Sequence, residues 1–206
     1  NLTYCWEQLD SGKVDASNFG PELLTGSINR SIPPSDNKIR YIPGMSEILN
    51  GNLTPSNPTL FSSWETVSNV ERTLTWGVTV RDRSESNPNG MGQISQDVKK
   101  IFVDATAGPF RIISNDSNDI VWKSGSNQKI NWDVVNTDRP PISTDRISIF
   151  LSVDNGENFS IPLAENIPNS GEAYIIVPGN VSTERARIKI SADNNIYFAV
   201  NATPFK

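Results

Sequence analysis

Histidine is absent from this 206-residue sequence, and cysteine occurs once, at Cys5. Without histidine the chain cannot build Ser-His-Asp or Cys-His nucleophile systems, and it lacks the imidazole ligand of most catalytic zinc sites. A single cysteine cannot form a disulfide within the chain. Cys5 lies between Tyr4 and Trp6 in a strand-like run, so we expect a buried, unreactive thiol. These absences predict a chain that is not itself an enzyme and that holds no catalytic cofactor.

Clustered basic residues and long apolar runs are also lacking. The 18 lysines and arginines are outnumbered by 23 acidic residues, which gives a net charge of −5. The densest basic pair, Lys99-Lys100, fits a solvated strand end, whereas a nucleic-acid binder would show a basic stripe. The negative charge disfavours an anionic membrane surface, and no apolar stretch approaches the ~20 residues of a transmembrane helix. We therefore expect neither a nucleic-acid partner nor membrane insertion.

Short alternating runs separated by turn formers fill the C-terminal half, which is typical of an antiparallel β-sandwich. Asn155-Gly156 has the composition of a tight hairpin turn, because both residues tolerate positive φ. Trp132 resembles the buried tryptophan of such cores. One face of the run before the turn is apolar and carries Ile147, Ile149, Leu151 and Val153.

The N-terminal half contains fewer clear strands and one long stretch of turn formers, residues 11–63. A loop of that length is uncommon inside a compact domain, so short strands are expected near 21–26 and 38–44. Farther along the chain, Val98, Ile101 and Val103 are the apolar positions of one more strand, and the run before it has a clear apolar face. That face carries Leu74, Trp76, Val78 and Val80.

These patterns predict an all-β fold of two tandem immunoglobulin-like or fibronectin-like β-sandwich domains. We place the first at 1–106, with long irregular insertions, and the second at 107–206, after the short linker Ala107-Gly108-Pro109. The chain begins "NLTYCWEQLD", an alternating run that reads as an interior strand. We therefore expect the first domain to be truncated at its N-terminus.

Calcium is the metal that the loops favour, because it takes six to eight oxygen ligands and Asp- and Asn-rich loops between strands can supply them. None of the loops has EF-hand spacing, and Asp and Asn are also ordinary turn residues. The candidate ligands are Asp82, Glu85, Asp154, Asn155, Glu157 and Asp193.

Two acidic residues suggest a glycoside-hydrolysing site as another possible function, since a pair of carboxyl groups suffices for that reaction. Glu7 and Glu65 each follow a tryptophan, and a Trp-Glu pair could line a sugar cleft. A core tryptophan beside an exposed acid is the simpler interpretation. Trp64 lies in a loop-like stretch and is the tryptophan whose exposure a structure should decide.

Several multi-residue blocks follow one another along nearly the whole chain, among them "LTYCWEQLDSG", "FGPELLTGSINRSIPPS", "SSWETVSNVERTLTWGVTVRD" and "ISIFLSVDNGENFSIPLAENIPNSGEAYIIVP". In their sequence and order these blocks resemble a segment of secreted reprolysin-like zinc metallopeptidases of the Bacteroidetes. In that family a catalytic domain with a histidine-rich zinc helix precedes immunoglobulin-like domains. The resemblance implies that this chain belongs to the immunoglobulin-like region and that zinc and catalysis belong to the parent's catalytic domain.

The resemblance predicts a secreted or cell-surface, non-catalytic accessory region that acts as a spacer, docks protein substrate or stabilises the parent protease. Its expected partners are the catalytic domain and a protein substrate. The alternative is a carbohydrate-binding or adhesive module that binds a surface glycan, because β-sandwiches host both functions. An exposed row of aromatic side chains would favour the alternative.

Overall fold

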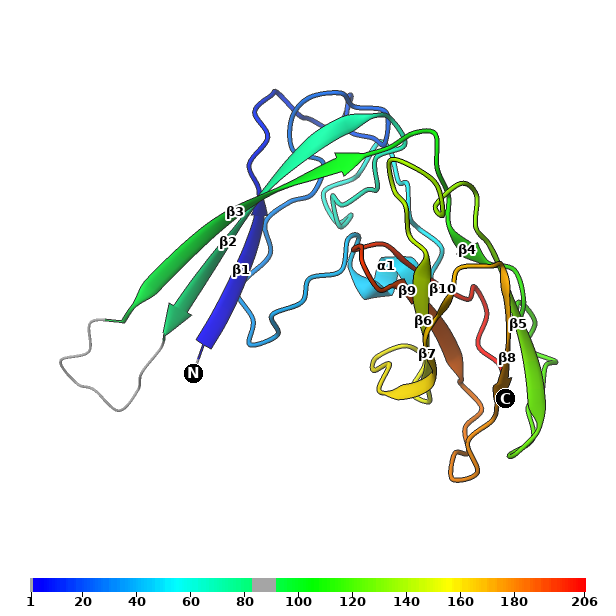
Figure 1. The fold of residues 1–206 in the computed structure, drawn as a ribbon. Helices are drawn as coiled ribbons and strands as arrows, with labels where there is room; N and C mark the ends of the chain where they lie inside the picture. The colour runs from blue at the N-terminus through cyan, green and yellow to red at the C-terminus, as the bar shows by residue number, and fades with distance from the viewer. Residues whose placement is uncertain (1, 83–91) are drawn as a thin grey trace. The chain divides into compact units, whose positions relative to one another are not determined.

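The computed structural model describes residues 2–82 and 92–206. Its strands form three antiparallel sheets, and the only helix in those residues is the five-residue α1 (Met45–Leu49) (Figure 1). The all-β prediction is therefore confirmed. No helix in the described part of the chain is long and apolar enough to span a membrane.

The chain divides into two compact units. The first contains residues 1–47 and 52–105, and the second contains 48–51 and 106–206. The immunoglobulin-like type of these units and the domain boundary at 106/107 stay predictions.

Two sheets of the second unit enclose one apolar core, so this unit is sandwich-like. One sheet has the order β10-β9-β6-β7 and the other the order β4-β5-β8. The strands of this unit are β4 (Arg111–Ile112), β5 (Asn127–Asp133), β6 (Arg146–Ser152), β7 (Ile161–Pro168), β8 (Glu172–Ile176), β9 (Arg187–Ala192) and β10 (Phe198–Val200).

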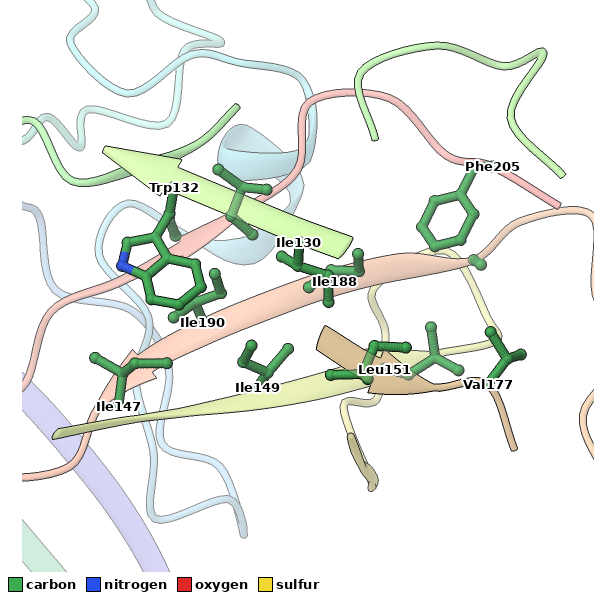
Figure 2. Packing of buried hydrophobic residues seen from close by; sticks show 13 residues of the cluster. Ile130, Trp132, Ile147, Ile149, Leu151, Val177, Ile188, Ile190 and Phe205 are labelled. Atoms are coloured by element: carbon green, nitrogen blue, oxygen red, sulfur yellow. The ribbon is translucent and has the colours of Figure 1, made fainter. Parts of the chain in front are cut away.

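The core of the second unit follows from the period-2 alternation of its strands. Successive side chains of a strand point to opposite faces, so every second residue of β6 reaches the core. Ile147, Ile149 and Leu151 are buried there, as predicted, whereas Val153 lies beyond the strand and is exposed. The indole of Trp132 is also buried, and its N–H donates to Asn169 Oδ1 at 2.8 Å. Figure 2 shows the side chains of Trp132, Ile147, Ile149 and Leu151 in this core, together with those of Ile130, Val177, Ile188, Ile190 and Phe205.

The connection between β6 and β7 contains the predicted positive-φ pair. Asn155 has φ 63° and Gly156 has φ 90°, so both adopt the left-handed conformation that their residue types favour. The connection is longer than a tight hairpin and spans residues 153–160. The turn is therefore where the sequence places it, but it belongs to a wider loop.

The first unit contains one three-stranded antiparallel sheet of order β1-β2-β3. A second sheet, which a sandwich requires, is not among the elements of its described residues. β2 lies in the centre and pairs Trp76 with Gln8 of β1 and with Lys99 of β3. The strands of this sheet are β1 (Leu2–Gln8), β2 (Arg72–Asp82) and β3 (Ile94–Val103).

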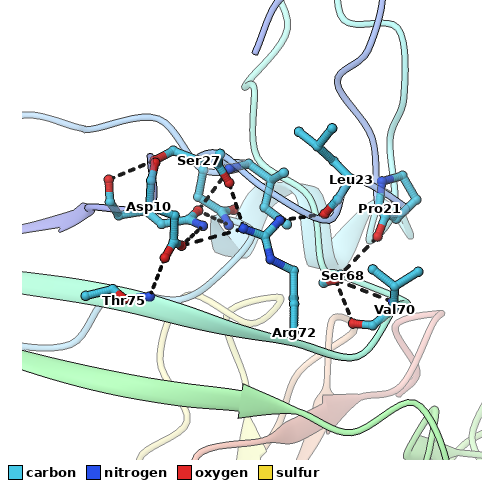
Figure 3. Close-up of polar contacts among 12 residues, drawn as sticks. Asp10, Pro21, Leu23, Ser27, Ser68, Val70, Arg72 and Thr75 are labelled. Carbon is cyan, nitrogen blue, oxygen red and sulfur yellow. Dashed lines mark hydrogen bonds and ion pairs between the residues drawn. The ribbon is translucent and has the colours of Figure 1, made fainter. Parts of the chain in front are cut away.

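Buried arginines hold the long stretch between β1 and β2 against one face of this sheet. The guanidinium of Arg72 donates to the carbonyl oxygens of Leu23 (2.6 Å) and Gly26 (2.8 Å) and lies 3.7 Å from a carboxylate oxygen of Asp10 (Figure 3). Asp10 in turn accepts the backbone N–H of Thr75. Arg72 thereby ties a segment without regular structure to the central strand.

Arg40 makes a second such connection. It donates to the carbonyl oxygens of Trp6 (2.5 Å) and Arg30 (2.7 Å) and to Glu65 Oε1 (2.6 Å). Its guanidinium also lies over the ring of Trp76, 5.2 Å from the centroid. Arginine suits this place because its planar fork of donors can satisfy several acceptors at once.

The short strands expected near 21–26 and 38–44 are not formed, so that prediction is wrong. Both stretches consist of turns, bends and irregular backbone, and the structure instead contains α1 in this region. The physical reason is that side chains satisfy backbone groups that strand pairing would otherwise have to satisfy. In 21–26, Arg72 donates to the carbonyl oxygens of Leu23 and Gly26. In 38–44, the Trp6 indole donates to Lys38 O and the Glu65 carboxylate accepts from Gly44 N–H.

Candidate functional site

The outer face of the β4-β5-β8 sheet carries the most exposed apolar side chains of the second unit's strands. Tyr174 is 65% exposed and Ile176 is 70% exposed, whereas Ile175 between them is 3% exposed and belongs to the core. Alternation along β8 therefore presents one aromatic and one aliphatic side chain to solvent. Contiguous exposed apolar groups of this kind mark interaction sites more often than isolated ones do.

β8 is also an edge strand, and its free edge carries the same residues. Trp132 N–H donates to Gly171 O (2.9 Å) and Val177 N–H donates to Ser126 O (3.0 Å), which are hydrogen-bonded pairs of the β5–β8 ladder. Such pairs alternate with pairs whose backbone groups point away. The backbone groups of Tyr174 and Ile176 therefore point to the open edge, and they have no partner among the described residues.

Charged side chains border this β8 edge. Lys129 Nζ lies 2.7 Å from Glu172 Oε2 and 5.8 Å from the centre of the Tyr174 ring. The hydrogen bond from Lys129 to Glu172 is the main reason why the pKa of Lys129 is raised above its usual value. On the opposite edge of the same sheet, Arg111 Nε lies 2.6 Å from Asp133 Oδ2. The site thus combines free backbone groups, two apolar side chains and one ion pair.

The predicted calcium ligands fall at separate places. Asp154 lies in the β6–β7 loop, where its carboxylate accepts the Ser152 hydroxyl (2.6 Å) and the backbone and side-chain N–H groups of Asn158 (2.9 and 2.7 Å). Partial burial acts to raise the pKa of Asp154, but these hydrogen bonds outweigh it and lower the pKa to about 2. Asn155 Oδ1 accepts from Arg187 Nε at 3.1 Å. The loop oxygens are therefore engaged by donors within the second unit.

Asp193 accepts the Ser148 hydroxyl at 2.7 Å and follows β9, at the end of the β6–β9 ladder opposite to Asp154. The separation along the strands is roughly 17 Å, so these two acids cannot share one ion. Glu157 is exposed in the β6–β7 loop and Asp82 ends β2, while Glu85 lies outside the described residues. No group of three or more His, Cys, Asp or Glu in the described residues is arranged to hold a metal ion. Calcium binding stays a prediction.

The two carboxylates that follow tryptophans do not share a role. Glu65 is 6% exposed, and its second oxygen accepts the backbone N–H of Gly44 at 2.9 Å in addition to its ion pair with Arg40. The expectation of an exposed acid is therefore wrong for Glu65. Glu7 is half-buried and accepts the Ser31 hydroxyl at 3.0 Å.

Two of the five tryptophans, Trp76 and Trp132, are buried, and the others are partly buried. Trp64, which the sequence places in a loop-like stretch, is among the partly buried ones and packs edge-on against Phe19, with 5.4 Å between ring centres. Cys5 is likewise half-buried, and its Sγ lies 3.6 Å from the carbonyl oxygen of Ile32. Tyr174, by contrast, is 65% exposed, and the sequence expectations for exposed aromatic residues do not include it.

The sequence did contain a signal for the β8 site. The run "EAYIIVP" is recognisable as a strand, and its even-numbered residues 172, 174 and 176 form the face opposite to the core residue Ile175. The run does not reveal the order of the strands in the sheet. β8 is an edge strand only because it comes last in the order β4-β5-β8.

Comparisons of the chain with known proteins identified no relative. No protein-family model, curated protein or solved structure matches the chain. The resemblance to reprolysin-like metallopeptidases therefore stays a prediction from the sequence blocks.

Proposed function

We propose that this chain is a non-catalytic accessory region of a secreted zinc metallopeptidase and that the open edge of β8 docks extended protein substrate. The sequence resemblance supports the parent family and the extracellular location. In this proposal the zinc and the catalytic residues belong to the parent's catalytic domain. The observation that carries the docking role is the pair of exposed side chains, Tyr174 and Ile176, on a strand edge with free backbone groups.

Strand addition suits an accessory region that must accept many substrates. An extended polypeptide that pairs with β8 gains main-chain hydrogen bonds whatever its sequence, and alternate side chains add selectivity. Tyr174 and Ile176 would contact every second side chain of the added strand on the outer face. Folded proteins, whose backbone groups are already paired, would bind poorly by this mechanism.

The test is a fluorescence titration of the whole chain with ribonuclease A that has been reduced and carboxamidomethylated, which keeps it unfolded. We expect a dissociation constant of roughly 10–100 µM, because a contact along one short strand edge buries little surface and such small interfaces are weak and transient. Native ribonuclease A should not bind. Equal binding of both forms would contradict the proposal, because the site would then not require free extended backbone.

Matched variants locate the binding. Ile176→Ser should weaken binding about fivefold or more, whereas Ile196→Ser, which changes an equally exposed isoleucine beyond β9, should leave it unchanged. Tyr174→Pro should weaken binding further, because proline removes an outward-facing N–H without removing a bond to β5. Equal losses in the two serine variants would refute a role for the β8 edge.

The carbohydrate-binding alternative has one supporting observation, the 65% exposed ring of Tyr174 beside the polar residues of β5. A titration with soluble xyloglucan separates the two functions. Saturable binding of xyloglucan that Tyr174→Ala abolishes, together with no binding of unfolded ribonuclease, would favour the alternative.

A further inference from the structure

The two edges of the first unit's sheet differ in how they are covered. Along the outer edge of β1, Tyr4 exchanges two backbone hydrogen bonds with Ser35 (2.7 and 3.0 Å). The carbonyl oxygens of Trp6 and Gln8 on the same edge accept from Arg40 and from the Ser27 hydroxyl. Edge strands are a route to association with another chain unless they are covered in such a way. β1 is therefore protected.

The outer edge of β3 is open by comparison. Asp82 N–H donates to Gln93 O at 2.9 Å, which fixes this as a hydrogen-bonded pair and makes the odd-numbered residues of β3 face β2. The even-numbered residues, 94 to 102, consequently direct their backbone groups outward. Only one of these outward backbone groups has a partner among the described residues. It is the N–H of Val98, which donates to Oδ1 of the neighbouring Asp97 at 2.8 Å.

The same even-numbered residues carry an exposed apolar row. Ile94, Val98 and Phe102 are 63%, 53% and 52% exposed, and they lie on one face of β3. Leu9, which directly follows β1, extends this row across the sheet: it is 52% exposed and packs over Gly77, the β2 residue that pairs with Val98. A side chain at Gly77 would meet Leu9 at 3.0 Å, so glycine there leaves room for the leucine.

We infer that β3 pairs with β3 of a second copy of this chain, antiparallel and centred on Val98. In this register Val98 faces Val98, and Ile94 faces Phe102, so each exposed apolar residue meets another. Asp97 faces Lys99 of the second copy, and Lys99 faces its Asp97. Opposite charges and apolar side chains placed directly across an antiparallel pair both stabilise it.

Charge and backbone geometry together single out this register. The outward backbone groups belong to even-numbered residues. They can form hydrogen bonds between the two copies only in registers that place even-numbered residues opposite even-numbered ones. A shift of the pairing by one such step sets Asp97 opposite Asp97, or Lys99 opposite Lys99, and like charges directly opposite are destabilising. Asp97 and Lys99 now form a 3.2 Å ion pair within their own strand, with side chains 62% and 69% exposed, so both can turn to new partners.

This inference concerns the first unit and does not depend on the β8 edge. Its test is sedimentation equilibrium of the whole chain between about 10 µM and 1 mM, with an expected dimer dissociation constant on the order of 0.1 mM for so small an interface. Lys99→Asp places two acids opposite each other and should weaken the dimer about tenfold. The swapped variant Asp97→Lys/Lys99→Asp restores complementary charges and should return to within about threefold of the original affinity.

Lys123→Asp is the matched control, because it makes the same charge change on an exposed lysine of the second unit. A chain that stays monomeric up to 1 mM would overturn the inference. So would equal weakening by Lys99→Asp and Lys123→Asp, or a swapped variant that dimerises no better than Lys99→Asp.

Cysteine crosslinking tests the register itself. Directly opposed residues of a hydrogen-bonded antiparallel pair have Cα atoms ~5.5 Å apart, within disulfide reach. Cys5→Ser/Val98→Cys should therefore form a disulfide-linked dimer under mild oxidation. Cys5→Ser/Lys100→Cys should not, because the two substituted positions would lie roughly 13 Å apart along the strands. Faster crosslinking of the second variant would contradict the proposed register.

Discussion

Replacing Arg40 by methionine should strongly destabilise the first unit. The side chains of Arg40 and Glu65 are 5% and 7% exposed, and their ion pair spans 2.6 Å. Methionine keeps much of the contact with Trp76 but removes three donors, so Glu65 keeps only the N–H of Gly44. Breaking a buried ion pair in this way costs about 3–5 kcal/mol, because an uncompensated charge stays buried. For a domain of this size that loss lowers the melting temperature by roughly 10–40 °C.

Differential scanning calorimetry of the whole chain measures this effect if the two units unfold in separate transitions. Arg40→Met should move the transition of the first unit and leave that of the second in place. The double variant Arg40→Met/Glu65→Leu should be markedly more stable than Arg40→Met, because no charge remains buried without a partner. A shift equivalent to less than about 1 kcal/mol, or additive losses in the double variant, would refute the reasoning.

Two more predictions concern the second unit. Asp154→Asn should lower the free energy of unfolding by about 1–2 kcal/mol at pH 7, a figure reduced for the partial exposure of Asp154 to water. Because the folded pKa of about 2 lies below the unfolded value, this stabilisation is present above pH ~4 and is lost as the pH falls through 2. Urea denaturation at pH 7 and pH 2 measures it, and an undiminished difference at pH 2 would exclude the carboxylate as its source. Ile149→Ala should cost about 2–5 kcal/mol and move only the second unit's calorimetric transition, and movement of the first unit's transition instead would contradict the division of the chain.

The sequence predicts the strands well where burial of one face decides the conformation. β6 shows this, because Ile147, Ile149 and Leu151 occupy every second position of the strand and all three reach the core. In β2 the same reasoning holds for Leu74 and Trp76, which are both buried, but it weakens after Trp76. There Thr79 is buried, and its hydroxyl accepts from the Gln96 side chain at 3.2 Å, while Val78 and Val80 are half-buried. Cross-strand hydrogen bonds of this kind have no period in the sequence.

The polar interior of the first unit could not be predicted from local pattern. Arg40 and Glu65 are 25 residues apart, and no local pattern in the sequence pairs them. Only the path of the chain brings them together beneath β1 and β2. The same limit applies to the candidate site: Tyr174 lies in a predictable strand, but edge position follows from strand order.

The most direct test of the docking role is a nitrogen-15 NMR titration of the whole chain with unfolded ribonuclease A. The account predicts that amide shifts concentrate at Tyr174 and Ile176 and that these amides become protected from hydrogen exchange, because their N–H groups gain partners. Residues of the β6–β7 loop should not shift. Shifts spread over other surfaces, with the amides of β8 unchanged and unprotected, would contradict the proposal that this edge binds extended polypeptide.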